Sequence, residues 1–98
     1  MGRMFEVSTE FPGHELVRDG LADLREGRET VAALLLQMAA PRLRALGIDV
    51  PHRDAADPPS HRLYSLLSES GYGPHSRYNA LVARIVSFAR AAEHAATR

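Results

Sequence analysis

The stretch VAALLLQMAA, residues 31–40, decides what kind of fold this chain can adopt. Its single polar residue is Gln37, so a helix formed here is apolar on nearly every side. A helix at the surface of a bundle keeps one polar face toward water. The stretch therefore predicts one of two arrangements. Either three other helices and the N-terminal arm surround this helix, or part of it faces a second subunit.

The chain before this stretch predicts a second helix that packs against the first. Residues 14–27 carry an apolar stripe at helical spacing, and Gly20 on that stripe would let another helix approach closely. The apolar helix itself spans residues 28–47, with a kink near Pro41 or a new short helix that begins there. The connection between the two helices is so short that they are expected to form an antiparallel hairpin.

The chain after the apolar helix predicts a second hairpin. Residues 47–57 are rich in proline and aspartate and form the loop between the hairpins. Residues 58–70 and 74–95 follow as two helices, the latter with the clearest apolar stripe in the chain. The predicted fold class is all-α: a four- to five-helix bundle built from two helical hairpins. Residues 1–98 form a single domain, of which residues 1–11 are an extended N-terminal arm.

The N-terminal arm has the alternating pattern of a β-strand. In MFEVSTEF, residues 4–11, apolar or branched side chains alternate with polar ones, and no second strand pattern occurs elsewhere. Two interpretations remain open. The arm packs on the helices through its phenylalanines, or it pairs across a two-fold axis with a second copy of the chain.

The apolar helix and the arm together favour a homodimer. Burying a leucine stabilises a protein by roughly 1.5–3 kcal/mol, and larger exposed apolar patches mark interaction sites. The residues expected at the dimer interface are Leu34, Leu35, Leu36, Met38, Phe5 and Val7. The function predicted first is therefore a non-enzymatic protein-interaction or assembly module that acts as a homodimer, with a further, unidentified protein partner left open.

The stretch GYGPHSRYN, residues 71–79, is typical of a turn between two helices. Gly71 suits the end of one helix and Pro74 the first position of the next. The start of a helix also offers free backbone N–H groups to an anion. The candidate anion- or nucleic-acid-binding residues there are His75, Ser76, Arg77 and Asn79.

Two alternative functions rest on resemblances in the second half of the chain. The spacing of LLSESGYGPHSRYNALVARI is similar to that of helix-turn-helix DNA-binding motifs, although the second helix is long and apolar for a recognition helix. The segment RAAEH, with Arg90 and His94, resembles the arginine and histidine spacing of helical ribonucleases of the HEPN superfamily. That resemblance implies a small ribonuclease, and the anion site implies an anion-binding enzyme.

Composition excludes several kinds of chemistry. The 98 residues contain no cysteine and no lysine, which removes thiolate sites, Schiff-base enzymes and the P-loop lysine. His52, Asp54, Asp57 and His61 follow no known metal-binding spacing, so no metal and no cofactor is predicted. Formal net charge is zero, which counts against nonspecific nucleic-acid binding. The chain shows no signal-peptide pattern or membrane-spanning run, so a cytoplasmic location is expected.

Overall fold

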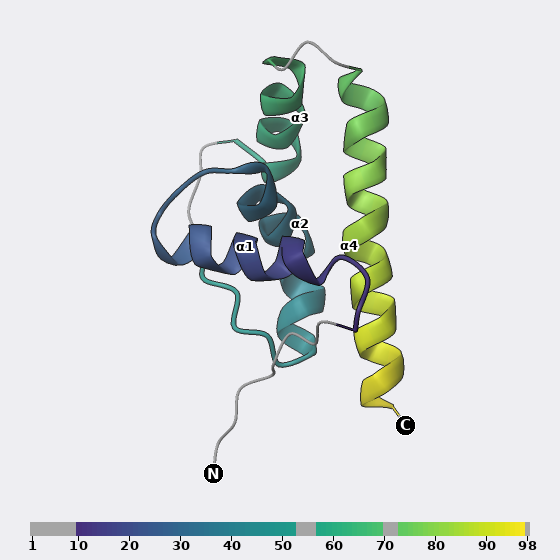
Figure 1. The fold of residues 1–98 in the computed structure, drawn as a ribbon. Helices are drawn as coiled ribbons and strands as arrows, with labels where there is room; N and C mark the ends of the chain where they lie inside the picture. Colours follow the sequence, from purple (N-terminus) through teal and green to yellow (C-terminus); the bar gives the residue numbers. More distant parts are fainter. Residues whose placement is uncertain (1–9, 53–56, 70–72, 98) are drawn as a thin grey trace.

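A computed structural model describes residues 10–52, 57–69 and 73–97, and this part of the chain is all-helical with no strand (Figure 1). The four helices are α1 (His14–Arg25), α2 (Val31–Ala45), α3 (Pro59–Glu69) and α4 (Pro74–Ala96). Each lies within a few residues of its predicted range, so the all-α class is confirmed. The strand-like pattern falls mainly on residues 1–9, which lie outside the described residues.

Helix α2 continues through Pro41 instead of ending or restarting there. The predicted second short helix is therefore wrong. Proline has no N–H to give to the preceding turn, and its ring needs space beside that turn. The Pro41 side chain is exposed, so the ring meets no packed neighbour on its outer side. Four helices, at the lower end of the predicted number, account for the described residues.

Helix α1 lies across α2 in Figure 1, and its Gly20 sits at the contact. A Cβ atom built on Gly20 would lie 2.6 Å from the Ala32 carbonyl oxygen and 2.6 Å from Leu36 Cγ. The close helix approach predicted at Gly20 is confirmed. Gly27 follows α1 with a φ of 74°, the left-handed conformation expected of a glycine just past a helix end. The antiparallel hairpin of α1 with α2 is not confirmed.

Helix α2 is the central helix of the fold. It contacts α1, α3 and α4. Its lack of a polar stripe fits a helix that has other helices of the same chain on three sides. In the single chain, α1, α3 and α4 pack around the part of α2 that holds the three leucines, and most of the N-terminal arm lies outside the described residues. The largest fully buried side chains of the core come from all four helices and the loop after α2: Val17, Leu34, Leu35, Leu36, Leu43, Val50, Leu63, Leu67 and Phe88.

The loop after α2 contributes to this core, which its composition did not suggest. Ile48 and Val50 are both buried. The Arg44 guanidinium donates two hydrogen bonds, of 3.1 and 2.9 Å, to the Val50 carbonyl oxygen. These bonds satisfy a backbone oxygen that the loop leaves without a helical or strand partner. The start of the predicted loop is thus fixed to the C-terminal half of α2.

Helix α4 runs the length of the molecule beside α2 and α3 (Figure 1). Phe88 of α4 packs edge-on against Phe11, with ring centroids 5.7 Å apart. This confirms the packing interpretation of the arm for its last phenylalanine. Tyr64 of α3 and Tyr78 of α4 form a second edge-on pair at 6.0 Å. None of the helices described is both long and apolar enough to cross a bilayer.

Candidate functional site

The three leucines expected at a dimer interface lie inside the single chain. Leu34 is 2% exposed, and Leu35 and Leu36 are 0% exposed. Side chains that are covered by their own chain have no apolar surface left to offer a partner. The sequence placed them at an interface because one subunit was expected to be unable to cover them. The single chain covers all three leucines, because α1, α3 and α4 pack around this part of α2.

The other three residues predicted at the dimer interface differ in where they lie. Phe5 and Val7 lie outside the described residues. Met38 is only half-buried, one turn beyond the covered leucines of α2. The apolar surface of α2 therefore does reach solvent around Met38.

Around Met38, an apolar groove of about 290 Å³ opens between α2 and α4. Its lining residues are Met38, Ala39, Pro41 and Arg42 from α2, and Val82, Ile85 and Val86 from α4. Six of these seven are apolar. We call these seven residues together with Glu93 the groove face.

The α4 side of the groove face follows from helical periodicity. Val82 and Val86 are one turn apart and both are half-buried. Tyr78, one turn before Val82, continues the same row toward α3. Ile85 lies deeper and is buried. Tyr78, Val82 and Val86 thus form the edge of the apolar stripe of α4. Their side chains stay partly exposed because the stripe is wider than the contact of α4 with α2.

One ion pair borders the groove. The Arg42 guanidinium donates hydrogen bonds of 2.6 Å and 2.7 Å to the two carboxylate oxygens of Glu93. This bidentate geometry joins α2 to α4 across the groove. The hydrogen bonds from Arg42 are the main cause of a lowered pKa for Glu93. Burial acts in the opposite direction, and the charges of Arg42 and Arg90 lower this pKa further. Glu93 likewise raises the pKa of Arg42.

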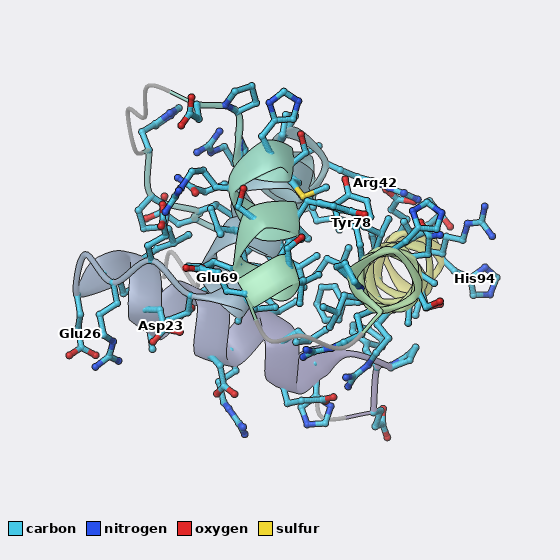
Figure 2. All side chains as sticks on the ribbon, turned by 90° about the horizontal axis from the view of Figure 1, so that it is seen from above. Asp23, Glu26, Arg42, Glu69, Tyr78 and His94 are labelled. Carbon is cyan, nitrogen blue, oxygen red and sulfur yellow. The ribbon has the colours of Figure 1, made fainter. Side chains whose placement is uncertain are left out.

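The groove face lies on the side of the molecule away from α1. Figure 2, viewed from above, shows Arg42 on the side of α4 away from the α1 ribbon and Tyr78 between α3 and α4. Helix α1 contacts α2 and α4 but not α3, and no described helix covers the groove between α2 and α4.

The four residues predicted to bind an anion lie at the start of α4. Pro74 occupies the first position of this helix, as predicted, and Gly73 precedes it. All four side chains, those of His75, Ser76, Arg77 and Asn79, are exposed. At 100° per residue they are spread around the axis of α4, and none lines the groove. The structure therefore places them on one turn without gathering them into a pocket.

The pair suggested by the ribonuclease resemblance lies on the outer surface of α4. Arg90 and His94 are both exposed, and His94 points away from the other helices in Figure 2. Glu93, between them, is directed to Arg42. Neither Arg90 nor His94 lines the groove. Within residues 10–52, 57–69 and 73–97, no group of three histidine or acidic side chains is arranged to hold a metal ion.

The groove face was missed by the sequence reasoning, except for Met38. Val82 belongs to the apolar stripe predicted in residues 74–95, and no role was predicted for Val86. A usable signal was present, because Tyr78, Val82 and Val86 form a row at four-residue spacing. Arg42 and Glu93 are 51 positions apart, and nothing in the sequence pairs them. Comparison with known protein families, curated proteins and solved structures finds no significant match for this chain.

Proposed function

We propose that this chain is a non-enzymatic module for protein interaction and assembly, and that the groove face is its contact surface. The observation that carries this proposal is the open apolar groove between α2 and α4, with Met38, Val82 and Val86 half-exposed along it. Exposed apolar surface in a small domain is costly in water and marks interaction sites.

The chemistry of the groove supports a protein partner over a small molecule. A cavity of about 290 Å³ is at the lower end of the range for small-molecule sites. Such sites also place polar groups where they bind a ligand. Here the charged groups at the groove, Arg42 and Glu93, are bound to each other. An apolar side chain or helix face from another polypeptide fits this surface better.

The test compares two glutamate substitutions on adjacent residues of α4. Val86→Glu places a carboxylate in the groove, whereas Ser87→Glu places the same group on the exposed side of the helix. The tagged full-length chain and both variants are used to capture proteins from an extract of the native host. Circular dichroism confirms that each variant is folded.

The proposal predicts that wild type and Ser87→Glu capture the same partner protein. Untagged copies of this chain count as a partner. Val86→Glu should retain at least about tenfold less, because burying an unpaired carboxylate is strongly unfavourable. Retention of the same proteins by all three forms, or of none by wild type, would contradict the proposal.

A further inference from the structure

The last part of the N-terminal arm, which the structure describes, lies against α4 (Figure 1). Phe11 packs edge-on against Phe88, and a Cβ atom on Gly13 would lie 2.8 Å from the Arg84 carbonyl oxygen. Val86, which lines the groove, stands between Arg84 and Phe88 in the sequence of α4. The end of the arm and the groove are therefore at the same level along α4, on different sides of this helix.

The path from the arm to the groove leads around the outer side of α4. At about 100° per residue, Val86 projects roughly 160° away from Arg84. A helix with its side chains is about 10–12 Å wide, so the path around half of it measures roughly 16–19 Å. Ala83 and Ser87 lie on this path, and both are exposed. The outer side of α4 is thus open to the arm at this level.

The arm is long enough to follow this path. Phe5 precedes Phe11 by six residues, and an extended chain advances about 3.3 Å per residue, which gives a reach of roughly 20 Å. The alternation of an extended chain also puts Phe5 on the same face of the arm as Phe11, which packs on α4. An extended arm that follows the surface of α4 therefore directs the Phe5 ring at the groove.

The groove has the size and chemistry that an aromatic side chain requires. Its volume is about 290 Å³, and a cavity of about 150 Å³ already holds a benzene molecule. Six of its seven lining residues are apolar, and Phe5 is the only aromatic residue among residues 1–9. A tether of a few residues keeps this ring at an effective concentration in the millimolar range. Weak affinity is therefore enough for the arm to occupy the groove for much of the time.

We propose that the N-terminal arm wraps around α4 and places Phe5 in the groove of its own chain. The arm thereby regulates the groove face, because a partner has to displace Phe5 before it can bind. This inference rests on the proposed function, since it names what controls access to the same groove.

The first experiment places a tryptophan at residue 5, because the chain contains no other tryptophan. In Phe5→Trp, the indole emission of the folded full-length chain should lie at a shorter wavelength than that of the same chain in urea. Adding Val86→Glu should move the emission to the wavelength seen in urea, because a carboxylate in the groove excludes an apolar ring.

The matched control is His94→Glu, which adds a carboxylate at an exposed position of α4 outside the groove and should leave the emission unchanged. Ser87→Glu is not suitable here, since Ser87 lies on the path of the arm. Circular dichroism shows that each variant is folded.

A second variant tests the reach of the arm and leaves the four helices unchanged. Deletion of Ser8 and Thr9 keeps Phe5 on the same face of the arm but shortens its reach to roughly 13 Å, which is less than half the circumference of α4. The emission of the shortened Phe5→Trp chain should therefore match that of the chain in urea. This result decides the question even if Val86→Glu does not fold.

The emission should not depend on protein concentration, because the contact is within one chain. A folded Phe5→Trp chain that emits as it does in urea would overturn the inference. So would a short-wavelength emission that persists in folded Val86→Glu or in the shortened chain. An emission that shifts with protein concentration would assign the contact to a second copy and overturn the arrangement within one chain.

Capture from the host extract separates this inference from the proposed function. Phe5→Ala should bind the captured partner at least about twofold more tightly than wild type, because the groove is then open in every molecule. A shielded tryptophan with no protein captured by wild type or Phe5→Ala would overturn the interaction module and leave the arm contact standing. A tryptophan that emits as in urea, with capture lost only in Val86→Glu, would overturn the arm contact and leave the module standing.

Discussion

Gly20 of α1 lies directly against Leu36 of α2, with room for no side chain between them. A Cβ atom on Gly20 would come within 2.6 Å of Leu36 Cγ and equally close to the Ala32 carbonyl oxygen. The leucine side chain can rotate away, but the backbone oxygen cannot move without moving α2. The distance between the two helices is therefore set by the missing side chain at residue 20.

Gly20→Ala should destabilise the fold although alanine is the better helix former. Overpacking costs about 1–3 kcal/mol, whereas the change from glycine to alanine in a helix gains about 1 kcal/mol. We expect a net loss in urea unfolding. Ser87→Ala, at an exposed position of α4, is the control and should change stability by no more than about 0.5 kcal/mol. A Gly20→Ala variant more stable than wild type would show that α1 and α2 do not pack this closely.

Leu35→Ala should reduce the free energy of unfolding by about 2–5 kcal/mol, because the side chain is fully buried and the surrounding core cannot close the cavity completely. This loss should be the same in dilute and concentrated protein, since Leu35 contacts only its own chain. Denaturant unfolding over a hundredfold range of protein concentration measures it. A penalty that changes with protein concentration would place Leu35 between two chains.

Thr30 links the start of α2 to α1 through a single hydroxyl group. Its oxygen accepts a 3.1 Å hydrogen bond from the Ala33 N–H, and its hydroxyl donates one of 2.6 Å to Asp23. Thr30→Ala should lower stability by about 0.5–2 kcal/mol, as loss of a helix cap does.

The same substitution has a second readout in the pKa of Asp23, which the Thr30 hydrogen bond lowers most. In Thr30→Ala this pKa should rise toward its ordinary value in a carboxyl NMR titration. Thr30→Ser keeps the hydroxyl and should keep the pKa low. An unchanged Asp23 titration in Thr30→Ala would show that the hydroxyl does not bond the carboxylate in solution.

The ion pair between Arg42 and Glu93 should make stability depend on pH. Because the pKa of Glu93 is lowered in the folded chain, its ionised form stabilises the fold above the unfolded pKa of about 4.3. That contribution is lost as the pH falls through the lower, folded pKa. The difference in urea midpoint between wild type and Arg42→Ala should therefore be largest at neutral pH and should disappear at acid pH.

Arg18→Ala is the control for this pH experiment. Arg18 bonds its exposed neighbour Asp19 on the same helix, so its removal should change the midpoint little at any pH. A difference between wild type and Arg42→Ala that persists undiminished below about pH 3 would contradict a role for the Glu93 carboxylate.

Much of the fold was predictable because its signals are local. Apolar residues at helical spacing identified all four helices, and Pro74 and Gly27 marked a start and an end correctly. Of the two alternatives predicted at Pro41, the new short helix is wrong, because the cost of a proline inside a helix depends on what surrounds its ring. The candidate site was less predictable. Met38 was named at an interface, but its partners Val82 and Val86 come from a helix about 45 residues away in sequence.

The sequence by itself determined that the chain is helical and that residues 31–40 need cover on every side. Helical periodicity and apolar burial are properties of short segments, so they can be read without knowing the fold. Only the tertiary structure decided what provides that cover. Leu34, Leu35 and Leu36 are covered because α1, α3 and α4 pack around α2, and this packing leaves a groove between α2 and α4 open. Which apolar side chains remain at the surface depends on how distant helices pack, and no local pattern specifies that.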